Sequence, residues 1–403
     1  MRPAVSRFLR VQGQNIVAGN DPVILKGVNL GGWLMMEGYI LHAPNAAEQA
    51  FKKKFLSAAG ERALKEFESE FRANFIRADD FRRIADIGFN CVRLPFNHRL
   101  VETAPDVYDH DGVKLLDRTV GWAKECGLWV VLDLHGACGA QNHDWHSDSL
   151  GTADLWTKKS CRDRTLALWK FLADRYRDEP AVAGYDLLNE PVLPDAGPLN
   201  DLYRQLIRTI RSVDKNHIIF LEGNRWAQDA ACLERFDDDN LAVSVHYYGA
   251  LEFTFNWVPH LAYPWETLHG RHDAGSIRGK LEEYQGLSRE RGVPVFVGEF
   301  GVNNREGRYG EGLWVADALK AFEEFGFHWT YWTYKAVKNH VFPDGLFSYY
   351  DNPAWVNRQG PLSGWDTYAE LWPEKKEEII RSWRTENFRE NEEIVKILKR
   401  ACR

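Results

Sequence analysis

The chain has 403 residues, of which 44% are hydrophobic and 27% charged, and its formal net charge is −7. This is the composition of an ordinary globular protein, and a negative chain without a long basic run has no general attraction for nucleic acid or anionic membranes. The basic start lacks the apolar stretch of a secretory signal, and the chain lacks the ~18-residue apolar run of a membrane span. Six cysteines without a C-x-x-C pair fit free thiols. We therefore expect a cytoplasmic protein.

The chain begins with a predicted hairpin at residues 8–22, where turn residues at Gly13 and at 19–22 follow short apolar runs. Eight apolar runs of strand length come next, at 23–29, 90–95, 128–134, 182–188, 217–221, 241–245, 294–298 and 327–332. Helical spacing lies between most of them, at 45–88, 163–177, 199–213, 276–291 and 312–325.

This alternation predicts an α/β fold, a closed (β/α)8 TIM barrel, because buried parallel strands read as continuous apolar runs. The whole chain, 1–403, is expected to form one barrel domain. Residues 1–22 would form its N-terminal hairpin, and the C-terminal segment 366–403 would contain one charged outer helix at about 373–400. Long loops are predicted after the first, third, sixth and eighth strands.

Two of the predicted strands end in a glutamate. Glu190 lies in Asn189-Glu-Pro191, where the proline ends the strand, and Glu299 ends the run from 294 to 298. In a (β/α)8 barrel, the carboxyl ends of the strands carry the active site. Two carboxylates at that edge are the minimal equipment of a retaining glycosidase, one as acid/base and one as nucleophile.

Other strand ends carry polar or aromatic residues as well. Any single one has an ordinary structural explanation, such as an ion pair or a core histidine whose hydrogen bonds are satisfied. That six of the eight predicted strands end in such a residue is hard to reconcile with chance. The residues are Arg93, His135, Asn189, His246, Tyr248 and Trp332, together with the two glutamates.

These motifs resemble glycoside hydrolase family 5, whose members are retaining β-glycosidases on a (β/α)8 barrel. The resemblance is nearest to the exo-β-1,3-glucanase (glucan 1,3-β-glucosidase) branch, and it runs from about residue 23 to residue 335. The stretches that carry it are KGVNLGGWL at 26–34, NCVRLP at 90–95 and LDLHGACGAQN at 132–142.

The resemblance implies roles for the strand-end residues and no cofactor. Glu190 would be the acid/base, with a pKa raised by burial and by the charge of Glu299, the nucleophile. The remaining implied roles are Arg93 and Tyr248 holding Glu299, Asn189 binding the sugar 2-hydroxyl, His135 and His246 lining the cleavage subsite, Trp332 forming its floor, and Glu37 and Asn142 gripping the terminal sugar.

The expected partner is an oligosaccharide or glycoside, and other readings stay open. Endo-β-1,4-glucanase, β-mannosidase, rutinosidase-type and glycolipid-type specificities share the same strand ends, because specificity is set in the loops. The aromatic segment 253–265 would then face the aglycone or pack in the core. A non-catalytic carbohydrate-binding barrel is a more remote alternative. So is a metal site, for which the candidate ligands are His135, Cys138, His143, Asp144, His146 and Asp148.

Overall fold

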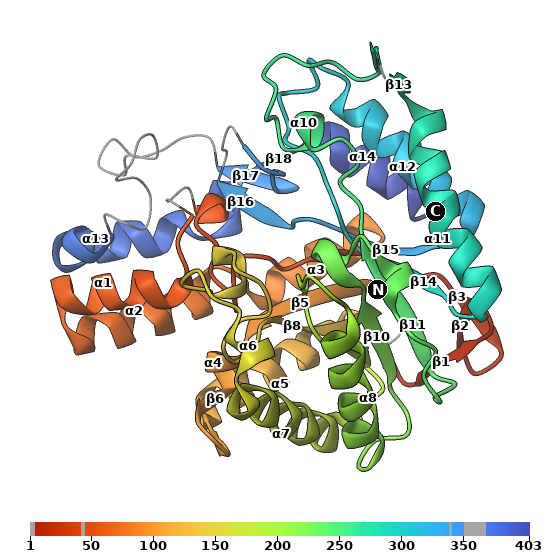
Figure 1. Ribbon diagram of the computed structural model, residues 1–403. Coiled ribbons are helices and arrows are strands. Elements are labelled where there is room, and N and C mark those ends of the chain that lie inside the picture. Colours follow the sequence, from red (N-terminus) through yellow and green to blue (C-terminus); the bar gives the residue numbers. More distant parts are fainter. Residues whose placement is uncertain (1–4, 42–44, 269, 338–340, 350–367) are drawn as a thin grey trace.

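The computed structural model describes residues 5–41, 45–268, 270–337, 341–349 and 368–403 (Figure 1). Eight parallel strands form a closed barrel in the order β10-β11-β14-β15-β4-β5-β8-β9. The predicted (β/α)8 barrel is therefore confirmed. Its strands are β4 (Lys26–Asn29), β5 (Cys91–Asn97), β8 (Trp129–Gly136), β9 (Val182–Asp186), β10 (Ile218–Glu222), β11 (Leu241–His246), β14 (Val295–Phe300) and β15 (His328–Tyr331).

Long helices surround the barrel and bury their apolar faces against it. These are α3 (Ala78–Ile87), α5 (His110–Glu125), α7 (Lys159–Tyr176), α8 (Gly197–Arg211), α11 (Ala274–Arg291) and α12 (Glu311–Phe325). Short elements lie in the loops between them. They are η1 (Tyr39–Leu41), α4 (His98–Val101), β6 (Glu102–Ala104), β7 (Val107–Tyr108), η2 (Trp145–Ser147), α6 (Asp154–Thr157), α9 (Asn224–Ala227), η3 (Ala230–Cys232), α10 (Leu251–Thr254), β12 (Trp265–Thr267) and β13 (Gly270–His272).

The N-terminal segment closes the bottom of the barrel. It forms a three-stranded antiparallel sheet of β1 (Leu9–Gln12), β2 (Asn15–Ala18) and β3 (Asp21–Val23), one strand more than the predicted hairpin. Leu9 and Ile16 share a buried cluster with the barrel residues Phe220 and Phe296. Residues 1–4 of the predicted hairpin lie outside the described chain.

The predicted helical stretch 45–88 contains three helices rather than one. Gly60, in the left-handed region at φ 84°, separates α1 (Glu48–Ala59) from α2 (Glu61–Asn74), and α3 ends at the predicted stop, Gly88, at φ 111°. Helix α13 (Tyr368–Ser382) lies along α1 and α2, away from the barrel (Figure 1). Buried aromatic rings join the three helices, among them Phe55, Phe67 and Trp372.

The prediction of one C-terminal helix is wrong. Helix α13 ends at Ser382, a short turn η5 (Thr385–Asn387) follows, and α14 (Glu392–Ala401) begins after β18 (Arg389–Glu390). The buried ammonium of Lys335 explains the break, because its Nζ donates to the Trp383 carbonyl (2.8 Å) and to the Thr385 hydroxyl (3.0 Å). Strand β18 pairs with β17 (Phe347–Tyr349), which pairs with β16 (Lys335–Val337). Residues 366 and 367 lie outside the described chain.

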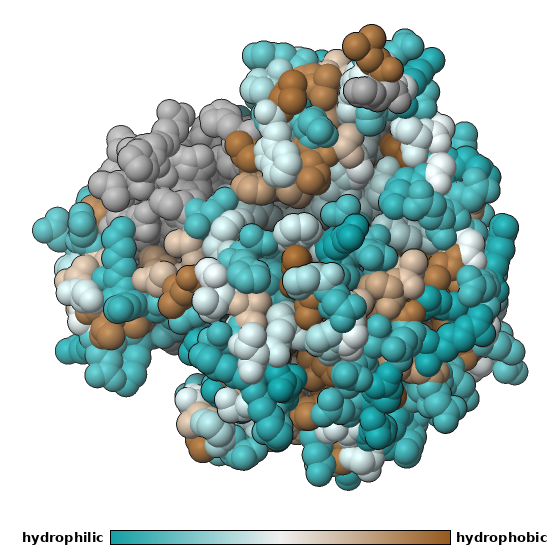
Figure 2. Space-filling view, viewed as in Figure 1, coloured by the Kyte–Doolittle hydropathy of each residue, from teal (hydrophilic) through white to brown (hydrophobic). Residues whose placement is uncertain are grey.

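The outer surface is mostly hydrophilic on the face in Figure 2, and its apolar side chains form small separate groups, the upper ones over the α10 and β13 region. Among the exposed large apolar side chains are Trp226 and Trp257. In the part of the chain that the structure describes, no helix combines the length and apolar character that a bilayer crossing requires.

Candidate active site

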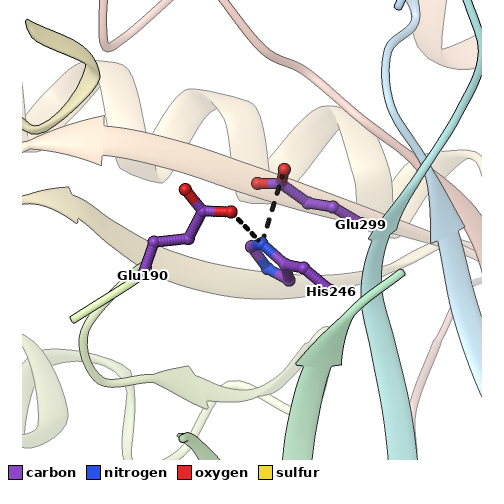
Figure 3. Close-up of side chains that lie close together, drawn as sticks. All are labelled: Glu190, His246 and Glu299. Atoms are coloured by element: carbon purple, nitrogen blue, oxygen red, sulfur yellow. Dashed lines mark hydrogen bonds and ion pairs between the residues drawn. The ribbon is translucent and has the colours of Figure 1, made fainter. Parts of the chain in front are cut away.

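The two strand-end glutamates converge on one histidine at the top of the barrel. His246, the last residue of β11, lies with its Nδ1 2.7 Å from Glu190 Oε1 and 3.5 Å from Glu299 Oε2 (Figure 3). Glu299 extends from β14, and Glu190 follows β9 in the loop. One ligand atom from each of the three side chains lies within 4.8 Å of the other two. The nearest oxygens of the two carboxyl groups therefore lie within 4.8 Å of each other.

Arg93 on β5 holds this arrangement together from below. Its side chain is fully buried, and its guanidinium meets four carboxylates. The distances are 2.9 Å from Nε to Asp186, 2.8 Å from Nη1 to Glu299, 2.9 Å from Nη2 to Glu222 and 3.2 Å from Nη2 to Asp133. A guanidinium suits this position because its planar donors reach several acceptors at once.

Glu299 has the two partners expected from the sequence. Arg93 Nη1 donates to Oε1, and the hydroxyl of Tyr248 donates to Oε2 at 2.8 Å. These two hydrogen bonds engage both carboxyl oxygens of Glu299 and fix the direction of its side chain.

Glu190 has an unusual backbone for a glutamate, with φ at +49°. Left-handed residues other than glycine are strained and persist only where the surroundings hold them. Here Glu222 Oε2 accepts a hydrogen bond from the Glu190 amide at 2.6 Å, and Asn142 Nδ2 donates to the Glu190 carbonyl at 2.9 Å. Both residues are buried and lie on other loops or strands, so the barrel fixes the direction of the Glu190 side chain.

Glu222 is a site residue that the sequence reasoning missed. It ends β10, faces His246 Nε2 at 3.2 Å and contacts Arg93. The signal was present, because Glu222 directly follows the predicted strand 217–221 just as Glu299 follows its own. Although burial opposes it, the positive charge of His246 holds the pKa of Glu222 below its ordinary value.

The carboxyl groups outnumber the cations in this core, and burial raises the pKa of three of them. Burial raises the pKa of Asp133 to about 8 against the opposing charge of Arg93. Burial and the charge of Glu222 raise the pKa of Asp186 well above its usual range. For Glu37, burial and the charge of Glu299 have the same effect on the pKa. Burial thus favours the neutral form of these three acids, whereas the pKa values of Glu190 and Glu222 are lowered.

The expected proton state of Glu190 is corrected by the structure. Burial does raise its pKa, but the hydrogen bond and positive charge of His246 outweigh it and lower the pKa to about 2. Conversely, burial disfavours imidazolium, yet Glu222 and Glu299 raise the pKa of His246 well above its usual value. The nearest charge to Glu190 therefore lowers its pKa instead of raising it.

Several of the predicted sugar contacts lie around Trp332. The indole of Trp332 stacks on the ring of His135 at 5.5 Å and 8°, and it donates to the Tyr39 hydroxyl. Glu37, which is 2% exposed, has its Oε1 3.6 Å from His135 Nε2, and this oxygen accepts no hydrogen bond from a described residue. Asn189 Nδ2 is also buried without a partner there, while its Oδ1 accepts from Arg93.

Asn142 is placed differently from the other predicted sugar contacts. It is fully buried, its Oδ1 accepts from the Asp144 amide at 2.8 Å, and its Nδ2 is engaged with Glu190. The structure thus gives Asn142 a part in supporting Glu190, and its contact with the terminal sugar stays a prediction.

The side chains of the candidate metal ligands between 135 and 148 do not all converge on one point. His135 contacts Asp133, Asp148 pairs with Arg99, and His146 faces Glu190. In the described part of the chain, two other groups are compact enough for an ion: Glu190 with His246 and Glu299, and Asp133 with Asp186 and Glu222. Arg93 already supplies the cation to both groups.

Known proteins share this fold and these motifs. Residues 52–338 match the model of cellulase (glycosyl hydrolase family 5). A β-xylosidase of Phanerodontia chrysosporium is 33% identical, over 82% of this chain and 71% of its own. A probable glucan 1,3-β-glucosidase A of Aspergillus fumigatus is 37% identical over 49% of each chain. The solved structure of Thermotoga maritima Cel5A with cellobiose has a TM-score of 0.62 at 21% identity, covering 93% of this chain and 97% of that one. The chain belongs to glycosyl hydrolase family 5 and is a glycoside hydrolase.

Proposed function

We propose that this protein is a retaining, exo-acting β-glycosidase of the β-glucosidase or exo-β-1,3-glucanase type. Glu299 is the nucleophile and Glu190 the acid/base. The observation that carries the proposal is the close approach of the two carboxyl groups around His246, whose nearest oxygens lie within 4.8 Å of each other. Retaining enzymes hold their carboxyl groups about 5–5.5 Å apart, whereas inverting enzymes need about 6.5–9.5 Å to admit a water.

The first half of the reaction needs a proton on Glu190. A bound sugar displaces water from the site, and a drier site disfavours an ion pair relative to its neutral form. A proton then moves from a neighbouring imidazolium to Glu190, which passes it to the leaving oxygen while Glu299 forms a bond to the sugar. In the second half, Glu190 takes a proton from the attacking water, and the bond to Glu299 breaks.

An exo-acting pocket is supported by the residues around Glu37. Burial favours the neutral form of Glu37, which can both donate to and accept from sugar hydroxyls, and its Oε1 accepts no hydrogen bond from a described residue. Glu37 lies beside His135 and Trp332, so it would meet the sugar bound over the indole. The relative named glucan 1,3-β-glucosidase A supports glucose as that sugar. The relative named β-xylosidase matches more of this chain and makes xylose the second candidate.

Two glutamate variants test the mechanism. We expect Glu190→Ala to lower kcat/KM about 10²–10⁴-fold on a substrate with a poor leaving group, and Glu299→Ala to lose at least as much. With an activated aryl β-glycoside, azide should rescue Glu190→Ala with retention and Glu299→Ala with inversion. The matched control is Glu282→Ala, an exposed glutamate on α11. Wild-type turnover in either site variant would refute the assignment.

Product analysis tests the substrate. We expect release of single glucose units from laminari-oligosaccharides, measured beside aryl β-glucoside, aryl β-xyloside, and cello- and manno-oligosaccharides. Internal cleavage would contradict exo action without touching the two glutamates. Activity on xylosides alone would move the proposal to the second sugar.

A further inference from the structure

Glu190 has a second histidine neighbour besides His246. His146 lies in the loop after β8, and its Nδ1 is 3.5 Å from Glu190 Oε2, the oxygen that His246 does not engage. On its far side, His146 Nε2 lies 3.5 Å from Asp144 Oδ2. The acid/base carboxylate is thus flanked by two histidines, one for each oxygen, and each histidine faces a further carboxylate: Glu222 behind His246 and Asp144 behind His146.

The two histidine–carboxylate pairs beside Glu190, His246 with Glu222 and His146 with Asp144, differ in burial, which indicates different roles. The His246 side is buried, with the side chains of His246 and Glu222 at 1% and 0% exposure. The His146 side leads outward, from His146 at 15% to Asp144 at 41%. Because Glu190 Oε1 is already held by His246, Oε2 is the oxygen left to face a leaving group or an attacking water. His146 therefore lies beside the oxygen at which the proton is exchanged.

A strained turn holds the outer end of this flank. Arg225, Trp226 and Ala227 all have positive φ, between 55° and 59°, and such residues tend to persist where function requires them. The turn directs the indole of Trp226 so that its Nε1 donates to Asp144 Oδ2 at 2.8 Å. The Trp226 amide also donates to the carbonyl of Pro191, next to Glu190, at 3.4 Å.

We propose that His146 is a positioning residue for the proton-exchanging oxygen of Glu190, oriented by Asp144 and Trp226. In bond breaking, the proton on His146 Nδ1 passes to Glu190 Oε2 and on to the leaving oxygen, and in the second half-reaction the proton of the attacking water returns the same way. The 3.5 Å gap closes when substrate is bound, as catalytic hydrogen bonds commonly tighten in the complex. Burial disfavours a charged His146, but the Asp144 carboxylate and Glu190 raise its pKa, which suits a residue that carries the proton.

The inference rests on the proposed acid/base role of Glu190, and leaving-group kinetics test both. Proton donation matters for a poor leaving group such as phenol and little for a good one such as 2,4-dinitrophenol. We expect His146→Gln to lower kcat/KM about tenfold or more on the phenyl β-glycoside, and by less than about threefold on the dinitrophenyl β-glycoside. Asp144→Asn and Trp226→Phe should produce the same selective loss, but smaller.

Two further variants make the result decisive. His143→Gln, an exposed histidine of the same loop, is the control and should leave both substrates unaffected. Glu190→Gln is the reference and should show the strongest selective loss. Selective loss in Glu190→Gln without any in His146→Gln or Asp144→Asn would overturn the inference alone, as would equal losses on both substrates. If Glu190→Gln itself showed no selective loss of kcat/KM on the phenyl β-glycoside, both the proposed acid/base role and the inference about His146 would be refuted. Should His146→Gln not fold, the same comparison of the two substrates is made with Asp144→Asn, because Asp144 is partly exposed.

Discussion

Replacing Glu222 with glutamine tests whether the buried charge network controls catalysis. Glu222 accepts hydrogen bonds from the Glu190 amide and from Arg93 Nη2, and it lies 3.2 Å from His246 Nε2. A glutamine keeps one acceptor oxygen and turns an N–H toward the remaining donors, so at least one buried charged donor loses its partner. The change therefore acts on the backbone of Glu190 and on the proton of His246 at the same time.

The magnitude follows from these contacts. Breaking a buried ion pair by removing one partner costs about 3–5 kcal/mol, and the acceptor oxygen that glutamine keeps retains part of the contact, which leaves about 2–4 kcal/mol. An unfolding entropy of about 2.1 cal/mol/K per residue converts this into a fall of Tm by about 2–5 °C for a chain of this length. The displaced Glu190 should lower kcat/KM by about 10²-fold, as small misplacements of catalytic groups do.

The assay combines urea unfolding with kcat/KM on an aryl β-glycoside. Asp238→Asn is the matched control, because Asp238 is a buried carboxylate that pairs with Arg211 away from the site. It should lower stability and leave kcat/KM within about twofold, since distant sites act independently. A Glu222→Gln enzyme with wild-type kcat/KM would refute the reasoning, even if its stability had fallen.

Two other predictions concern stability against pH and the sugar floor. The pKa of Lys335 is lowered to about 8 by burial, whereas an unfolded lysine has a pKa of about 10.4. Between these values the unfolded chain binds more protons, so the free energy of unfolding should rise with pH in wild type relative to Lys335→Met. Urea unfolding at pH 7.5 and 10 measures this, with exposed Lys114→Met as control, and an unchanged difference would contradict it. In Gly31→Ala, the new Cβ would lie 2.8 Å from the Trp332 ring, and we expect KM to rise severalfold, since overpacking costs about 1–3 kcal/mol. Gly286→Ala on α11, where the Cβ meets nothing within 4 Å, is its control, and an unchanged KM would show that Trp332 does not support the sugar.

Most of the barrel was predictable because each strand carries its own signal. Buried parallel strands are apolar throughout, and a polar residue at the carboxyl end marks the edge of the sheet, as at His246 and Glu299. The break after Ser382 was not predictable in this way. It depends on the ammonium of Lys335, which is about fifty residues away in the sequence and meets the Trp383 carbonyl only in the folded protein.

The proton state of Glu190 was not predictable for a related reason. Sequence reasoning placed Glu299 as its main electrostatic neighbour, and two carboxylates alone would raise the pKa. The structure adds a cation between them, His246, whose charge is maintained by Glu222 from a strand that was not assigned to the site. The sign of a pKa shift depends on the nearest charges, and these are set by three-dimensional contacts between strands.

The position of Arg93 has a consequence for how this enzyme can change. Its four carboxylate partners belong to four different strands, and all of them lie inside the barrel rather than in the long loops. The reactive groups thus belong to the barrel strands, whereas the loops determine which sugar is accepted. Loop exchange between relatives should therefore yield enzymes that remain chemically competent on new sugars, whereas a single substitution in the barrel interior disables every specificity at once.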